Sequence, residues 1–96
     1  FTSQNITLSS SDYDLLEIYV KQAKGNLRAQ STRIPKGYDG MLYTEYDDGT
    51  IARRLATRVS DTQYTIGSVQ STAGYNDDNV IPIYVVGYKI NIFSGN

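Results

Sequence analysis

The chain has 96 residues, with 9 Lys and Arg, 10 Asp and Glu and no His, so its formal net charge is −1. This length suits one domain with a single hydrophobic core. The near-neutral charge gives no reason to expect nucleic acid or an anionic membrane as a partner, and no apolar run approaches the ~20 residues of a transmembrane helix. The absence of Cys and His removes disulfides, the usual general base and the commonest metal ligand.

Tyrosine dominates the aromatic residues, with 9 Tyr against 2 Phe and no Trp. Tyrosine suits a pleated, half-buried surface, and it also suits contact surfaces that are apolar on one side and wet on the other. The bias therefore fits both an ordinary β protein and a surface that binds sugar or protein. Because the chain begins at Phe1 and its only methionine is Met41, we expect one domain over residues 1–96 that is either processed or, as we favour, a piece of a longer polypeptide.

The first half of the chain alternates between apolar and polar residues, as strands do. Ile6 to Leu8 predicts a short strand, and Tyr13 to Ala23 predicts a core strand because every second residue from Leu16 to Val20 is apolar. Gly25-Asn26 predicts a two-residue hairpin turn. The polar stretch Leu27 to Ile34 should pair back antiparallel as an edge strand.

The middle of the chain contains one ambiguous segment. Gly40 to Tyr46 predicts a strand that ends in the turn Asp47-Asp48-Gly49. In Ile51 to Val59 the large apolar residues recur every four positions and Thr50 could cap a helix, yet as a strand the same residues share one face. We favour a strand with Ile51, Leu55 and Val59 on one face, because the preceding turn has hairpin chemistry, and the helix stays open as the alternative.

The last third continues in β structure. Thr62 to Gln70 predicts a strand with Tyr64 and Ile66 facing inward, and Ser68 is a further candidate for the inward face. Val80 to Phe93 has the densest run of β-branched and aromatic residues, so it predicts a strand near the middle of the domain, with its first half covered on both faces.

Two residues in this last stretch should shape the strand. Gly87 is the natural place for a bulge, and Pro82 should lie near the strand start or on an edge. Together the segments predict an all-β fold, an antiparallel β-sandwich of the jelly-roll kind with about seven strands.

No stretch carries a catalytic pattern, so we expect a protein that is not an enzyme. There is no His and no G-x-S-x-G elbow to activate a serine, and nothing in the sequence places Glu17 or Glu45 across a cleft from a second carboxylate. Asp77 and Asp78 lack the spacing of a calcium loop. We therefore expect neither a metal nor a cofactor.

Tyrosines beside acids and amides in loops are the best candidates for a binding site. A tyrosine ring can lie against the apolar face of a sugar while neighbouring oxygens and amides bond to its hydroxyls. Two loops have this combination, and the candidate ligand-binding residues are Tyr38, Asp39, Tyr75, Asn76, Asp77 and Asp78. The five arginines fit solvated strand faces or ion pairs, with binding of an acidic glycan as the alternative.

The order of several motifs resembles a family of phage proteins. An opening I-T-L-S, then S-D-Y-D-L-L-E-I-Y-V-K, and a closing I-P-I-Y-V-V-G-Y-K are similar to the C-terminal β domains of minor structural proteins in bacteriophage tails, the tail-fibre and baseplate group. The similarity spans roughly Ile6 to Lys89. It implies a non-enzymatic virion protein, commonly a homotrimer, located at the tail tip where the host surface is met.

Three functions follow from these expectations. The first is a phage tail domain that recognises a saccharide on the bacterial cell surface. The second is a structural module that holds a trimer or attaches to other tail proteins, which would bury outward-facing Tyr13, Tyr19 and Tyr43 between subunits. The third is a carbohydrate-binding module of a secreted enzyme, which the lack of Trp makes less attractive.

Overall fold

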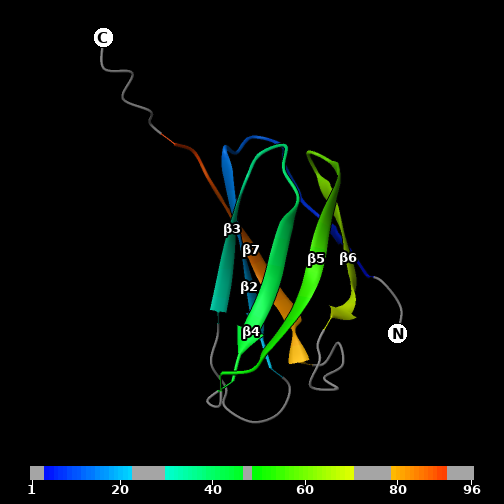
Figure 1. The fold of residues 1–96 in the computed structure, drawn as a ribbon. Helices are drawn as coiled ribbons and strands as arrows, with labels where there is room; N and C mark the ends of the chain where they lie inside the picture. The colour runs from blue at the N-terminus through cyan, green and yellow to red at the C-terminus, as the bar shows by residue number, and fades with distance from the viewer. Residues whose placement is uncertain (1–3, 23–29, 47–48, 71–78, 91–96) are drawn as a thin grey trace.

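The computed structural model describes residues 4–22, 30–46, 49–70 and 79–90, and these form seven antiparallel strands in two sheets (Figure 1). One sheet has the strand order β1-β6-β5-β4, and the other has the order β3-β2-β7. Within the described ranges there is no α-helix. The predicted all-β sandwich with seven strands is confirmed. The strands are β1 (Gln4–Thr7), β2 (Leu15–Lys21), β3 (Gln30–Pro35), β4 (Gly40–Glu45), β5 (Ile51–Ser60), β6 (Gln63–Gln70) and β7 (Ile81–Tyr88).

The core lies between the two sheets and is built from alternate residues of their strands. β2 contributes Leu16, Ile18 and Val20, as its alternation predicts, and β6 contributes Tyr64 and Ile66. All five side chains are almost completely excluded from solvent. Burial of this apolar surface is the main favourable contribution to folding.

β2, and not β7, is the central strand of its sheet. β2 pairs with β3 on one side and with β7 on the other, so the prediction that Val80 to Phe93 lies near the middle of the domain is wrong. β7 is an edge strand, and the expected cover on both faces is also wrong because Ile83 and Tyr84 are exposed. Hydrophobic density in the sequence therefore marked an edge strand whose outer face remains open.

The irregularity in β7 lies at Ile83 and not at Gly87. The register moves from Tyr19↔Tyr84 to Val20↔Pro82, which leaves Ile83 as the extra residue. Pro82 follows the first residue of the strand, as predicted, where a missing N–H costs little. Gly87 serves close packing, because a Cβ atom there would lie 3.2 Å from the Cβ atom of Tyr13.

Tyr13 is a core residue and does not face outward as the sequence suggested. Its side chain is almost completely buried, and its hydroxyl donates to the carbonyl of Asp61 at 2.7 Å. The Nζ atom of Lys36 lies 5.3 Å from the centre of the same ring. Tyr13 therefore joins the loop before β2 to the β5–β6 turn, and it cannot contribute to a contact between subunits.

Residues 51–60 form the predicted strand, and Ile51, Leu55 and Val59 share one face as expected, but this face does not pack on the core. Ala52, Arg54 and Ala56 are buried. Ile51, Leu55 and Val59 instead point to solvent. The buried guanidinium explains this phase, because Arg54 Nε donates to the carbonyl of Gly67 at 2.7 Å and Nη1 donates to the carbonyl of Val80 at 3.0 Å. The expectation that the arginines are solvated is wrong for Arg54.

A bulge in β6 shifts the alternation of that strand. Gly67 and Ser68 together face Leu55 of β5, because the register moves from Ala56↔Ile66 to Arg54↔Val69. Ser68 is therefore exposed, contrary to the extension of the inward face, and Val69 packs against the core instead. An extra residue in one strand of an antiparallel pair has this effect on every residue beyond it.

The sandwich is closed on one side and open on the other. On the closed side β3 meets β4, where Thr32 Oγ1 donates to the carbonyl of Met41 at 2.9 Å and Gln30 Oε1 accepts from the N–H of Glu45 at 3.2 Å. On the open side the edge strands are β1 and β7. A groove of about 500 Å³ lies there, with Ile6 and Val85 among the residues that line it.

Candidate functional site

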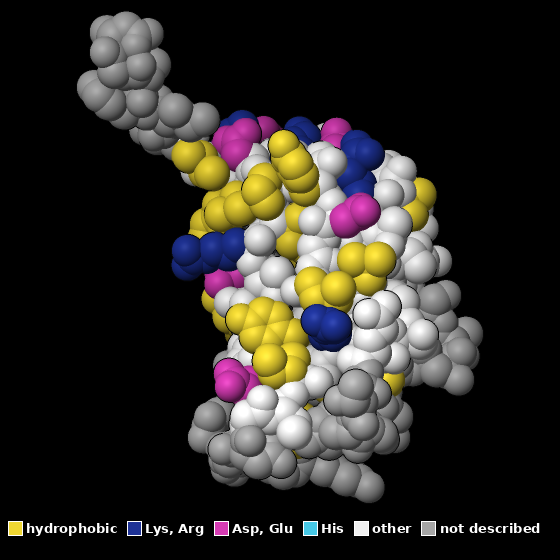
Figure 2. Space-filling view, in the orientation of Figure 1, with side chains coloured by type: hydrophobic (Ala, Val, Ile, Leu, Met, Phe, Trp, Pro, Cys, Tyr) yellow, Lys and Arg dark blue, Asp and Glu magenta, His cyan; other side chains and the backbone are white. Residues whose placement is uncertain are grey.

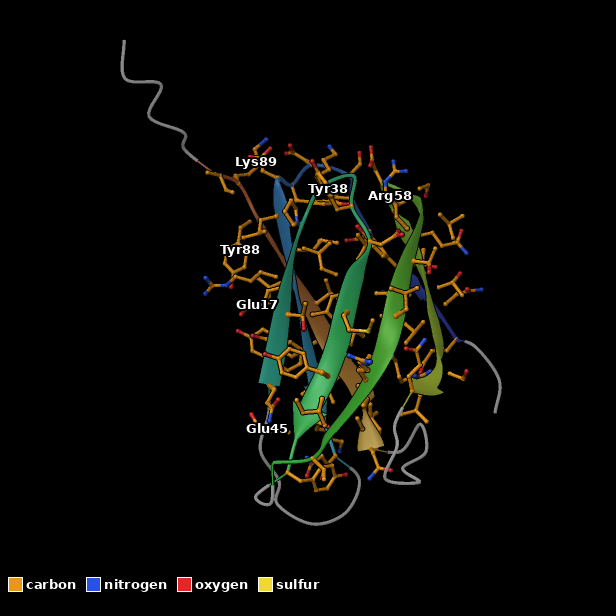
Figure 3. The ribbon with its side chains drawn as sticks, viewed as in Figure 1. Glu17, Tyr38, Glu45, Arg58, Tyr88 and Lys89 are labelled. Atoms are coloured by element: carbon orange, nitrogen blue, oxygen red, sulfur yellow. The ribbon has the colours of Figure 1, made fainter. Side chains whose placement is uncertain are left out.

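The outer face of the three-stranded sheet carries a nearly buried carboxylate among tyrosines. Glu17 lies at the middle of β2 and is only 5% exposed, although it points away from the core. Directly opposed residues in an antiparallel sheet share a face, so Glu17 lies beside Arg33 of β3 and Val86 of β7. In Figure 3, Glu17 and Tyr88 lie near each other on the same side of the molecule.

Three hydroxyl groups donate hydrogen bonds to this carboxylate. Ser31 Oγ donates to Oε2 at 2.6 Å, while the hydroxyls of Tyr88 and Tyr19 donate to Oε1 at 2.7 Å and 3.1 Å. Arg33 Nε lies 3.6 Å from Oε2. These groups occupy both carboxylate oxygens, so Glu17 fixes the position of its neighbours.

These bonds shift the pKa values of the groups that make them. The hydrogen bond from Ser31, followed by that from Tyr88, lowers the pKa of Glu17 to about 2, because hydrogen bonds to a carboxylate favour its charged form. The same carboxylate raises the pKa of Tyr88 to about 12. At neutral pH the site therefore holds a carboxylate and protonated phenols.

Next to this carboxylate, two tyrosine rings form a small aromatic platform. The rings of Tyr19 and Tyr84 have their centres 4.7 Å apart at an interplanar angle of 32°. Tyr84 is 55% exposed, and Tyr88 is also exposed on the same strand. We call the outward side chains of Glu17, Tyr19, Arg33, Tyr84 and Tyr88 the tyrosine face.

The tyrosine face offers both apolar and polar contacts to a ligand. The ring surfaces can cover an apolar group, and each phenol that donates its proton to Glu17 keeps its oxygen lone pairs as acceptors. Arg33 adds donors at the edge, with a side chain that is 71% exposed. A flat, polyhydroxylated molecule would meet an aromatic surface, fixed acceptors and a cationic donor together.

A scan of known protein families, of curated proteins and of solved structures finds no match to this chain. The site is therefore interpreted from its own geometry.

The structure describes two of the six residues predicted to bind a ligand. Tyr75, Asn76, Asp77 and Asp78 lie outside the described residues. Tyr38 and Asp39 lie in the turn between β3 and β4, at the end of the molecule opposite Glu45 (Figure 3).

The two described candidates have different surroundings. The side chain of Tyr38 is exposed, as a binding ring requires. Asp39 Oδ1, however, accepts the N–H of Arg58 at 2.7 Å, so this carboxylate already stabilises the backbone of β5. Arg58 also bonds Asp61 Oδ1 through Nη2 at 2.6 Å. The polar groups of this turn are engaged within the protein, which makes it a weaker site than the tyrosine face.

Few features of the sequence point to the tyrosine face. Tyr19 was predicted to face outward, which its position across from Tyr84 confirms. The sequence suggests Glu17 at most as a catalytic acid, and one of its three hydroxyl donors, Tyr88, is 71 positions away in the chain. The alternation E-I-Y in β2 indicates that Glu17 and Tyr19 share a face, but only the pairing with β7 brings the other two tyrosines to them.

A second exposed face carries four large hydrophobic side chains, with Arg53 exposed among them. It lies on β4 and β5, where Tyr43, Ile51, Leu55 and Val59 are exposed. Figure 2 shows hydrophobic side chains over these strands, with a cationic side chain among them. We call these four residues the apolar face.

The described residues show neither a metal centre nor a helix that could cross a membrane. Among them there is no group of three or more Asp or Glu side chains that could hold a metal ion. No helix in these ranges is long and apolar enough for a membrane span.

Proposed function

We propose that this domain binds a saccharide on its tyrosine face, without chemical turnover. The single observation that carries the proposal is the ionised Glu17 carboxylate, 5% exposed, under tyrosines on an outward sheet face. A carboxylate in such a place costs desolvation free energy, which its three hydroxyl donors offset. The result is a set of phenol groups held in fixed orientations at the surface, which lowers the entropy lost on binding.

The chemistry of the face suits a sugar ring better than a charged or purely apolar ligand. The C–H groups on one side of a pyranose can lie on the rings of Tyr19 and Tyr84, and its hydroxyls can donate to the phenol oxygens. Arg33 can donate to a ring or exocyclic oxygen at the edge of the same face. Glu17 itself stays below the contact surface and holds the tyrosines.

The biological setting that we propose comes from the sequence resemblance to tail-fibre and baseplate domains. In that setting the ligand is a saccharide on the bacterial cell surface, and the domain belongs to the tail of a virion. Labelled domain should then bind whole host cells, and periodate oxidation of the surface polysaccharide should abolish this binding. Undiminished binding after oxidation would contradict a saccharide receptor.

A glycan array followed by calorimetry with any ligand found tests the binding site itself. Tyr84→Ala should weaken binding roughly tenfold or more, because an aromatic contact of this kind is lost together with its apolar area. Tyr43→Ala is the matched control, since Tyr43 is 41% exposed on the other sheet. Equal effects of the two substitutions would place the ligand elsewhere, and a chain that binds no glycan would refute the proposal.

A second candidate function is a structural module that attaches to other tail proteins. The observation in its favour is the apolar face on β4 and β5, because exposed clusters of large hydrophobic side chains mark many protein interfaces. The two functions separate in one experiment. A stable trimer in solution with no glycan binding would support the structural role, whereas glycan binding that depends on Tyr84 would support the first proposal.

A further inference from the structure

We propose that the edge of β7 pairs with β7 of a second copy of this chain in an antiparallel, two-fold dimer. This inference goes beyond saccharide binding and is tested without a sugar. Among the described residues, β7 has a partner strand on one side only, since β2 is its neighbour and the sheet of described strands ends there. Every second residue of an edge strand directs its N–H and C=O away from the sheet, where another strand can bond them.

Only the second half of β7 is suited to such pairing. Proteins protect sheet edges with charged side chains, prolines and bulges. Pro82 and the bulge at Ile83 protect the first half of the strand. The segment Tyr84–Tyr88 has neither, it keeps a regular register with β2, and it contains no charged residue.

The order of side chains in this segment complements itself. In an antiparallel pair centred on Val86, the outward residue Tyr84 lies opposite Tyr88 of the second copy, and Val86 lies opposite Val86. On the inward side Val85 lies opposite Gly87, so a branched side chain meets a residue without one. Cross-strand aromatic pairs stabilise sheets, and no like charges meet in this register, which is why we choose a second copy as the occupant.

The open side of the sandwich gives the paired strand a place to bury its inward side chains. The groove beside β7 has a mixed lining in which Ile6, Leu8 and Leu16 supply apolar surface beside polar residues such as Ser9 and Asp12. Ile6 and Leu8 are only partly buried in the single chain. A strand added next to β7 would cover them, and would join two three-stranded sheets into one sheet of six strands.

The same pairing would join the tyrosine faces of the two copies. Tyr84 and Tyr88 point to the outer face of the sheet in each chain, so a two-fold pair places both platforms on one continuous surface. Two sites held side by side would raise the avidity for a repeating polymer without a new contact within each site.

Sedimentation velocity of the intact chain over a range from about 10 µM to about 1 mM tests the association. Because a single strand edge buries a small area, we expect a reversible dimer whose population rises with concentration. Val86→Lys places two ammonium groups opposite each other across the axis and should weaken the dimer roughly tenfold or more. Leu55→Lys, on the apolar face, is the matched control and should leave the dimer unchanged.

A cysteine variant tests the register even if Val86→Lys were to disturb the fold. The chain has no cysteine, so Val86→Cys introduces a single thiol. Directly opposed residues in an antiparallel pair have Cα atoms about 4.5–5.5 Å apart, which a disulfide can span. Oxidation should give a covalent dimer with Val86→Cys and little with Leu55→Cys. A chain that stays monomeric at the highest concentration, a trimer, or association that Leu55→Lys abolishes and Val86→Lys does not would overturn the inference.

Discussion

A pair of leucine substitutions on neighbouring strands tests which face of the four-stranded sheet is the core. Leu42 of β4 is completely buried, whereas Leu55 of β5 is 37% exposed. Leu42 lies opposite Arg54 and Leu55 lies opposite Met41, so the two leucines point to opposite sides of one strand pair. Because opposed residues share a face, either the Leu42 side or the Leu55 side of the β4–β5 pair packs on the core. The substitutions Leu42→Ala and Leu55→Ala show directly which side it is.

The structure predicts a large difference between the two variants. Leu42→Ala removes buried methyl and methylene groups and leaves a cavity between the sheets, which should lower the free energy of unfolding by about 3 kcal/mol, within the usual range of 2–5. Leu55→Ala leaves no cavity because solvent already reaches the side chain, so we expect a loss of about 1 kcal/mol or less. Both variants make the same Leu-to-Ala change in a β-strand, so the change in intrinsic strand preference is equal in the two and cancels in the comparison.

Urea unfolding followed by circular dichroism measures both values. For a domain of this size, a loss of about 1 kcal/mol lowers the melting temperature by roughly 4–8 °C, so thermal scans should show the same order. The opposite phase of the strand pair, with Ile51, Leu55 and Val59 inward, predicts the reverse ranking. A loss for Leu55→Ala equal to or greater than that for Leu42→Ala would therefore refute the packing described here.

Three further changes test the environment of Glu17 and one close contact. The pKa of Glu17 is lowered from its ordinary 4.5 to about 2. Its contribution to stability is therefore present above pH 4.5 and is lost as the pH falls toward 2. Glu17→Gln should flatten the fall in melting temperature over this pH range. The pKa of Tyr88 is raised from 10 to about 12, so its contribution to stability is present below pH 10 and is lost as the pH rises through 12. In an ultraviolet titration, Tyr88→Phe should remove the phenol that titrates at the highest pH. A titration unchanged by this substitution would contradict the bond to Glu17. Gly40→Ala should destabilise the fold by roughly 1–3 kcal/mol, because its Cβ would overlap the buried Ile34 side chain. Ile34→Val in the same chain should recover part of this loss. Additive losses in a double-mutant cycle would show that the two residues do not meet.

The strands themselves could be predicted because their alternation is local. In β2 every second residue is apolar, and Leu16, Ile18 and Val20 face the core as that pattern requires. Gln30, Thr32 and Arg33 make β3 polar, as an edge strand requires, and β3 pairs with β2 as expected. Both inferences need only the period of a strand and the chemistry of a sheet edge.

The phase of β5 could not be predicted because its decisive residue is a buried cation. Large apolar residues usually face the core, so the sequence favoured Leu55 over the two alanines that flank Arg54. The carbonyls of Gly67 in β6 and of Val80, just before β7, accept from the Arg54 guanidinium, and the local sequence pattern does not connect either of them to Arg54. Small Ala52 and Ala56 beside the long side chain then fill the remaining space.

The central position of β2 could not be read from hydrophobicity either. β7 has a denser apolar run than β2, yet it lies at the edge of the sheet, with Ile83, Tyr84 and Tyr88 exposed. Such density is typical of a strand covered on both faces, and it is equally compatible with an edge that contacts something outside the chain. The candidate site has the same origin, because Tyr84 and Tyr88 are part of this run.

The two outward faces of the sandwich differ in what they can recognise. The apolar face on β4 and β5 offers hydrophobic contact, which is not directional. It can therefore cover a partner without selecting among partners of similar shape. On the tyrosine face the Glu17 carboxylate fixes the hydroxyls of Tyr19 and Tyr88, so a ligand that fails to match these oxygens leaves polar groups unpaired. Loss of such pairing is a strong source of discrimination. For this reason we place recognition of a hydroxyl-rich ligand on the tyrosine face and attachment, where it occurs, on the apolar face.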